Sequence, residues 1–315
     1  MKKKVIMYIG NALMLVAVIL MIWKMIHLEI DYSLYFNASG ILRILLLSGL
    51  YGVLLVVMSL SWRQTNSVIA GKPISFWVSS KVYCKSNLLK YIPGNVFQYV
   101  GRNELAERLE LSHGDVAMAT GIDVFEQFFS FFLVSIIFCG YGFMQIIKEY
   151  IFLQIFLPVG ILAALVIIWV LLHFIGRKNK EKLDYYRSLL VWRNIPVLLK
   201  CIFRYVVIAV GFGSVYLLVI SDIVTIHVHA GEYFEIFGVF TLSWLFGFIT
   251  PGAPGGIGIR EAVLTLLLGS KYDVTPFLTG IVIYRLINTL GDIIAYSITV
   301  LGEKIWRLKL WRNTQ

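Results

Sequence analysis

The sequence predicts an all-α polytopic membrane protein, built as an inverted repeat with three spanning helices and one re-entrant hairpin in each half. Three observations lead to this fold class: an apolar composition, an uneven distribution of cations, and a Pro-Gly and Arg spacing that occurs twice. Of 315 residues, 59% are hydrophobic and 15% are charged, whereas soluble domains carry about 25% charged residues. Several apolar runs approach the ~20 residues that span a bilayer. We therefore expect residues 1–315 to form a single integral membrane domain.

Six spanning helices are expected from the apolar runs. The first run is too long for the hydrophobic part of a signal peptide, and no small-residue cleavage site follows it, so it should remain as a membrane helix. The polar connection Gly176–Pro196 mixes aromatic residues with cations, which favours an interfacial helix. The spanning helices are expected at about Val5–Ile26, Ile41–Trp62, Asp115–Tyr141, Tyr150–Phe174, Val197–Ile220 and Pro276–Leu301.

Two further segments are apolar but interrupted by proline and glycine. Phe234–Gly269 contains two prolines and four glycines between Thr250 and Glu261, and no helix passes through such a run intact. Irregular backbone at membrane depth is tolerated only where it is buried in protein or lines a wet cavity. Lys72–Gly114 has Pro93-Gly94 near its centre and too many cations for a spanning helix. We interpret both segments as re-entrant hairpins.

The two hairpins share a spacing that indicates an internal repeat. Pro93-Gly94 and Pro251-Gly252 are each followed at the same interval by an arginine, Arg102 in the first case and Arg260 in the second. The spacing from Pro93 to Pro251 is 158 residues, and the same offset carries the start of the second helix close to the start of the fifth. Three spans per half would invert the second half. The repeats are expected at residues 1–142 and 150–303, an arrangement typical of transporters.

The charge distribution predicts the orientation. The net charge is +10, but the cations gather before the first helix, between residues 177 and 204, and after the last helix. These places fall on one side of the expected topology, as the positive-inside rule requires. We therefore expect the plasma (inner) membrane as location, cytoplasmic N- and C-termini, and no nucleic-acid partner.

An anion site is expected at the tip of the second hairpin. Unpaired N–H groups at a helix start, together with an arginine, favour negative charge, and an ionisable residue inside a membrane is usually functional. The alternative is a tight turn between packed helices, in which the arginine only caps a neighbouring group. The residues expected to bind a lipid headgroup or its phosphate are Arg260, Gly255, Gly256, Gly258, Glu261 and Arg102.

Further polar residues interrupt two of the spanning helices, each set on one helix face by its spacing. We expect them, with the two hairpin arginines, to surround a polar cavity between the halves. Glu126 and Arg285 occupy nearly matching repeat positions with opposite charge, and we expect them to form a gating pair; the alternative is a purely structural ion pair that locks the two helices together. The cavity and gating residues are Asp123, Glu126, Gln127, Arg285, Asn288 and Asp292.

Other kinds of site have weak support in the sequence. Three scattered cysteines form no CxxC motif. His227 and His229, with Glu232 nearby, lack the third strong ligand of a metal site. No P-loop is present, so direct use of ATP is not expected. We expect neither a metal nor a cofactor.

The run Pro254-Gly255-Gly256-Ile257-Gly258-Ile259-Arg260-Glu261-Ala262 resembles a family signature. It is similar to the Pro-Gly-Gly-(Leu/Ile)-Gly-x-Arg-Glu-Ala motif of the lysylphosphatidylglycerol synthase transmembrane region, or flippase-like domain, family. The Pro93 to Arg102 segment and the acidic stretch from Asp123 to Glu126 fit its looser marks, although Gln127 stands where many members have arginine. The resemblance covers most of the chain. It implies movement of charged or glycosylated lipids between leaflets, and in stand-alone members a link to polysaccharide or glycolipid pathways.

The function expected from residues and resemblance together is that of a lipid flippase, not an enzyme. Its substrate would be a lipid-linked sugar, a polyprenyl-phosphate carrier or a charged phospholipid, with a glycosyltransferase or a lipid-modifying enzyme as partner. The chain ends at Gln315 without a synthase domain, so aminoacylation is not expected. The alternatives are a membrane-embedded lipid-modifying enzyme, which would change the lipid chemically, and a non-catalytic scaffold for a glycosyltransferase.

Overall fold

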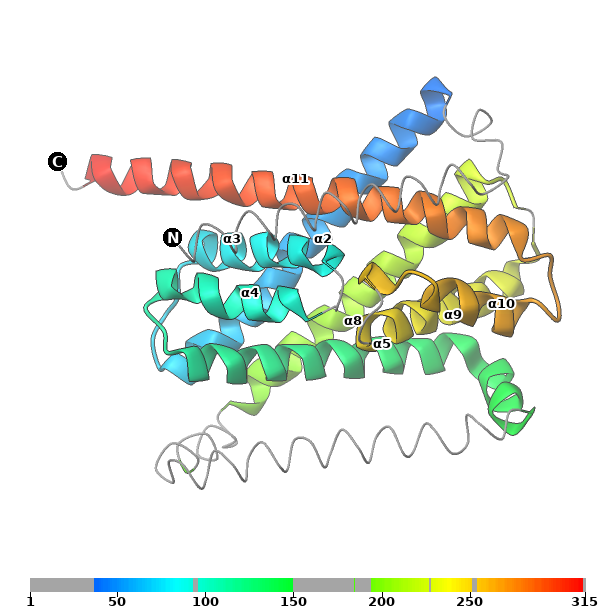
Figure 1. Cartoon of the computed structure of the whole chain (residues 1–315), viewed down its shortest axis with the longest axis horizontal. Coiled ribbons are helices and arrows are strands. Elements are labelled where there is room, and N and C mark those ends of the chain that lie inside the picture. The colour runs from blue at the N-terminus through cyan, green and yellow to red at the C-terminus, as the bar shows by residue number, and fades with distance from the viewer. Residues whose placement is uncertain are drawn as a thin grey trace.

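The computed structural model describes residues 37–92, 96–149, 184, 194–226, 228–250 and 254–313, and all regular secondary structure in these ranges is helical (Figure 1). This confirms the predicted all-α class. The elements are α2 (Ala38–Ala70), α3 (Phe76–Asn87), η2 (Leu88–Tyr91), α4 (Phe97–Leu105), η3 (Ala106–Leu109), α5 (His113–Glu149), α8 (Ile195–Leu218), the π-turn η4 (Val219–Ile223), α9 (Ala230–Ile249), η5 (Pro254–Gly256), α10 (Ile259–Leu268) and α11 (Thr275–Asn313).

Five stretches of the described chain are long and apolar enough to cross a membrane. They are Ala38–Ala70, His113–Cys139, Ile195–Ile223, Ala230–Ile249 and Thr275–Leu308. Four of them correspond to expected spans, and the fourth stretch in this order is the incoming arm of the second expected hairpin. The expected spans Val5–Ile26 and Tyr150–Phe174 and the expected interfacial helix Gly176–Pro196 lie outside the described residues.

The helix α2 is longer than the sequence predicts, because polar side chains near its end donate hydrogen bonds to backbone carbonyl groups of the same helix. The expected end was Trp62, before a polar run, but the helix continues to Ala70. Asn66 donates to the carbonyl oxygen of Trp62 at 2.7 Å, and Ser67 donates to that of Arg63 at 3.0 Å. Side chains bonded in this way can stay inside a helix. The helix ends at Gly71, whose φ of 62° fits glycine.

At the other end of the chain, Asp273 fixes the start of α11. Its carboxylate accepts the backbone N–H of Thr275 at 3.0 Å. This bond lowers the pKa of Asp273, because it stabilises the charged form of a carboxyl that lies outside the spanning helices. The short connection between Leu268 and Thr275 joins α10 to α11. It brings residues of the two helices together at the site described below.

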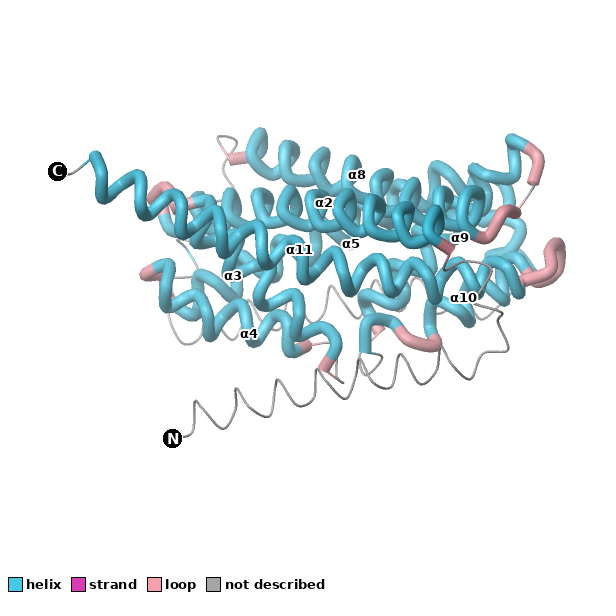
Figure 2. Tube along the Cα trace, turned by 90° about the horizontal axis from the view of Figure 1, so that it is seen from above, coloured by secondary structure: helices cyan, strands magenta, loops and turns pink. Residues whose placement is uncertain are grey.

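The short helices lie between two of the long ones. In Figure 1, α3 and α4 occupy one end of the molecule and α9 and α10 the other, between α5 and α11; Figure 2 shows the same separation from above. The turns that follow α3 and α9 meet near the middle. A side-chain carbon at Gly255 would lie 4.0 Å from the ring of Tyr91. Along the chain, the described helices follow one order of lengths twice: a long helix, two shorter helices, and a second long helix.

Many large apolar side chains are exposed on the outer surface, and several charged side chains are buried. Leu46, Ile137 and Phe203 are 66%, 63% and 70% exposed, whereas Asp123 and Asp292 are 1% and 0% exposed. Monomeric soluble proteins rarely expose large continuous apolar patches. This distribution fits a protein whose outer surface contacts lipid.

Helices α5 and α9 approach closely at Gly238. A Cβ atom there would lie 2.4 Å from the backbone nitrogen of Cys139 and 2.7 Å from the carbonyl carbon of Phe138. Backbone atoms cannot rotate away as a side-chain end can. Small residues at such crossings are the usual means by which membrane helices pack closely.

Gly238→Ala is therefore expected to destabilise the protein by about 1–3 kcal/mol, the range for an overpacked core position. The measurement is thermal unfolding of the purified protein in detergent. Gly231→Ala is the matched control in the same helix, because nothing lies within 4 Å of a Cβ atom at that position. Equal melting temperatures for the two variants would show that the crossing is not tightly packed.

Candidate functional site

A partly open cavity lies where the two central turns meet the long helices. Its walls come from α2, α3, η2, α4, α5, α8, α9, α10, α11 and the turn between α9 and α10, which includes η5. The lining residues are Tyr51, Leu55, Met58, Tyr83, Asn87, Lys90, Tyr91, Gln98, Arg102, Gln127, Phe212, Trp244, Gly247, Phe248, Gly255, Ile257, Arg260, Arg285 and Asn288.

Four cations line this cavity, namely Lys90, Arg102, Arg260 and Arg285, and none of its described lining residues is an acid. The sequence predicted that acids would share the lining. That part of the prediction is wrong for the described cavity: Asp123, Asp292 and Glu261 pair with its cations, and Glu126 does not line it. Long basic side chains can line a cavity with their stems while their charged ends reach a buried partner.

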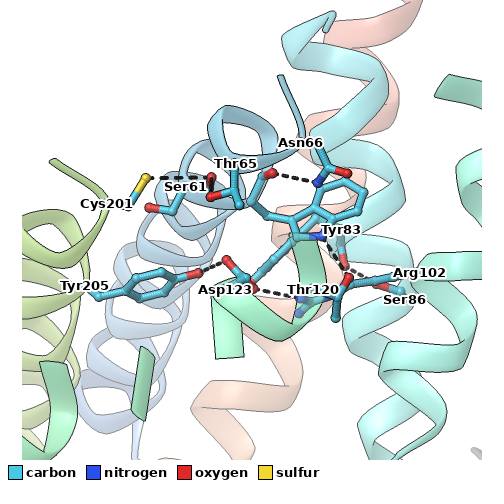
Figure 3. A network of polar contacts seen from close by, with 11 residues as sticks. Ser61, Thr65, Asn66, Tyr83, Ser86, Arg102, Thr120, Asp123, Cys201 and Tyr205 are labelled. Atoms are coloured by element: carbon cyan, nitrogen blue, oxygen red, sulfur yellow. Dashed lines mark hydrogen bonds and ion pairs between the residues drawn. The ribbon is translucent and has the colours of Figure 1, made fainter. Parts of the chain in front are cut away.

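The first pair joins α4 to α5. Arg102 Nη1 lies 2.8 Å from Asp123 Oδ2, and both side chains are buried. The phenol of Tyr205 in α8 donates to the other carboxylate oxygen, so Asp123 holds three helices together (Figure 3). The Arg102 guanidinium also lies 4.0 Å from the ring centre of Tyr83.

The second pair joins η2 to α11. Lys90 Nζ lies 2.7 Å from Asp292 Oδ2. The Tyr91 hydroxyl donates to the same oxygen at 2.6 Å, and the Asn87 amide donates to Oδ1 at 2.9 Å. This fully buried carboxylate therefore has an ion-pair partner and two further donors, which together offset the free energy of taking it out of water.

The third pair joins α10 to α11. Arg285 meets Glu261 with both nitrogens of its fork, at 2.7 and 2.8 Å, and also donates to the carbonyl oxygen of Gly256 at 3.2 Å. The predicted pair between Glu126 and Arg285 is wrong. Neither carboxylate oxygen of Glu126 has a hydrogen-bond partner in the described structure, and its side chain does not line the cavity.

Arg260 is the cation that remains. Within the described ranges it forms no ion pair and donates no hydrogen bond, although the residue is only 7% exposed and its Nε atom is fully enclosed. Its guanidinium lies 5.6 Å from the ring centre of Trp244. A Cβ atom at Gly247 would lie 2.9 Å from Arg260 Cγ and Nε, so glycine is needed there to admit the side chain. The fold thus makes room for a buried guanidinium that no acid of the described residues neutralises.

The glycine-rich turn contributes less than the sequence predicts. The Gly258 amide, one of those expected to hold a phosphate, donates instead to Glu261 Oε2 at 3.0 Å. Gly256 offers its carbonyl oxygen to Arg285, and Gly255 lines the cavity. Positive φ angles of 57°, 73° and 87° at these three residues explain why the turn needs glycine. The turn positions Arg260 and Glu261. Of these two residues, only Arg260 lines the cavity.

Further lining residues, some predicted and some not, complete the site. Gln127 and Asn288, both predicted, line the cavity, and Asn288 Oδ1 is buried without a partner. Lys90 and Trp244 line it as well but were not predicted as site residues. The 158-residue offset offers a signal for Lys90, because it carries that position to Phe248, which also lines the cavity.

Metal binding has no support in the described part of the chain, where no three His, Cys, Asp or Glu side chains are grouped to hold an ion. His227, one of the weak metal candidates, lies outside the described residues. No protein-family model matches the chain, and no curated protein matches it. The resemblance to the flippase-like domain family therefore stays an expectation drawn from the residues that carry it.

Proposed function

We propose that the protein is a flippase that binds the phosphate of a lipid headgroup at Arg260 and carries the lipid between leaflets. The substrate belongs to the lipid-linked sugars, polyprenyl phosphates or charged phospholipids, and the protein moves its substrate without changing it chemically. The observation that carries the proposal is the unneutralised Arg260 guanidinium in a cavity whose other cations are paired. The signature around Arg260 supports the same class of function.

A charge count supports an anionic ligand. Lys90, Arg102 and Arg285 each face one acid, so these pairs contribute no net charge to the cavity. Among the residues that the structure describes, none forms an ion pair with the buried Arg260, which therefore adds one uncompensated positive charge. A lone charge inside a membrane protein is costly and usually marks a substrate path. A guanidinium binds phosphate oxygens through a planar fork, which suits a headgroup phosphate.

The helix order supports an inverted repeat with two hairpins. The series α2, α3, α4, α5 is followed by α8, α9, α10, α11, and the turns of the two pairs meet at the cavity. We propose that the pairs enter the membrane from opposite sides and that the cavity lies near its midplane. In transporters with such repeats, rocking of one half against the other opens the site to each side in turn.

The test is transport of acyl-labelled phosphatidylglycerol and a short polyprenyl phosphate in proteoliposomes containing the full chain. Arg260→Ala is expected to slow transport at least about tenfold, because removal of one charged hydrogen-bonding partner typically costs 2–5 kcal/mol of binding. Arg260→Lys should recover part of the rate, since it restores the charge without the fork.

Lys304→Ala is the matched control, because it removes one cation from an exposed position of α11 that does not line the cavity. It should transport like the unchanged protein. Equal rates for Arg260→Ala and Lys304→Ala, with both folded, would remove the anion-site argument. Protein-free vesicles that move both lipids as fast as the unchanged protein would remove the flippase proposal.

A further inference from the structure

We infer that the site selects headgroups that carry net negative charge and hydroxyl groups, and rejects headgroups that carry an ammonium group. The inference rests on the proposed function and deepens it, because a phosphate alone does not distinguish these headgroups. Phosphatidylglycerol and phosphorylated sugars belong to the first class. Phosphatidylethanolamine and aminoacylated lipids belong to the second.

The first support is that each acid in contact with a lining cation is already paired with that cation. An ammonium group needs a carboxylate or an aromatic face when it leaves water. Asp123, Glu261 and Asp292 are each held by a cation of the protein, at 2.8, 2.7 and 2.7 Å respectively. The described lining offers no acid to a ligand, and an incoming ammonium would also meet the positive charge of Arg260.

The second support is that cations of the protein already lie over four of the six aromatic rings that line the cavity. Arg102 lies over Tyr83, and Arg260 lies over Trp244. Lys90 lies 5.3 Å from the ring centre of Tyr91 and 5.8 Å from that of Tyr51. A cage for an ammonium ion needs such faces open toward the ligand. Here these four rings already contact cations of the protein itself.

The third support is the chemistry of the buried polar atoms that have no hydrogen-bond partner in the described structure. The Nε atoms of Arg102, Arg260 and Arg285 are buried donors without partners, and all three residues line the cavity. Asn288 Oδ1 is a buried acceptor without a partner. Buried polar atoms in native proteins are usually satisfied. A phosphate accepts from the guanidinium donors, and a hydroxyl donates to the amide oxygen, so a hydroxylated phosphate satisfies both sets.

The experiment measures binding of four short-chain lipids with the same acyl chains to the purified full chain in detergent. Phosphatidylglycerol has negative charge and hydroxyls, phosphatidic acid has the charge without the hydroxyls, phosphatidylethanolamine adds an ammonium, and lysyl-phosphatidylglycerol is cationic. We expect phosphatidylglycerol to bind at least about tenfold more tightly than the two amines. Phosphatidic acid should lie between them. Water-soluble glycerol 3-phosphate tests whether the headgroup suffices without the acyl chains.

Asn288→Asp supplies a second measurement, in a variant that we expect to fold. The change keeps the shape and places an acid in the cavity, so the preference for phosphatidylglycerol over phosphatidylethanolamine should fall toward one. Equal affinity of the unchanged protein for the anionic and amine lipids, with Arg260→Ala weakening both, overturns the inference and leaves the proposed site intact. Affinities that Arg260→Ala leaves unchanged for every lipid overturn the proposed site itself.

Discussion

Asp123→Asn is expected to destabilise the folded protein by about 3–5 kcal/mol, the range for breaking a buried ion pair by removal of one partner. The change preserves the shape of the side chain but leaves Arg102 buried without a counter-charge. It also weakens the hydrogen bond from Tyr205. Because Asp123 joins α4, α5 and α8 (Figure 3), the loss affects three helices at once. The measurement is thermal unfolding in detergent.

Glu126→Gln is the matched control, one helical turn further along α5. This carboxylate is also buried, at 1% exposure, but neither of its oxygens has a hydrogen-bond partner in the described structure. Its replacement therefore removes no ion pair, and we expect a change of about 1 kcal/mol or less. Similar losses from the two substitutions would show that burial of the carboxylate, and not its pairing with Arg102, controls stability.

The contrast between these two acids shows the limit of sequence reasoning here. The helical spacing correctly placed Asp123, Glu126 and Gln127 on the inward side of one helix, where all three are buried. It could not assign partners, because these depend on how helices rotate and approach one another in three dimensions. Glu126 and Arg285 occupy similar repeat positions. In the structure, however, Arg285 forms its ion pair with Glu261, because the connection between α10 and α11 brings these two helices together.

The arginines were easier to predict than the acids. Proline and glycine mark where a helix must break, so the repeated spacing to Arg102 and Arg260 identified two positions beside the central turns, and both residues line the cavity. Lys90 was missed as a site residue. Its role depends on Asp292, which lies about 200 residues away in sequence and contacts it only after α11 packs beside η2. No local pattern contains that contact.

The pair formed by Glu261 and Arg285 leads to an asymmetric prediction for ligand binding. Either single substitution to glutamine breaks a largely buried pair and should lower stability by about 2–5 kcal/mol. Their effects on anion binding should differ. Arg285→Gln releases Glu261, the chain neighbour of Arg260, to neutralise that guanidinium, so affinity for phosphatidylglycerol should fall at least about tenfold. Glu261→Gln leaves Arg260 uncompensated and also removes the acid partner of Arg285, so affinity for phosphatidylglycerol should not fall.

The double variant Glu261→Gln with Arg285→Gln decides how Arg285 acts. It again leaves Arg260 as the one uncompensated cation of the described cavity, as in the unchanged protein. If charge balance at Arg260 controls binding, the double variant should bind phosphatidylglycerol more tightly than Arg285→Gln alone, even though both lack the arginine. If Arg285 contacts the headgroup directly, the double variant should bind as weakly as that single variant. Recovery of affinity in the double variant would place the anion on Arg260 and assign to the Glu261–Arg285 pair the task of keeping that guanidinium free of its nearest acid.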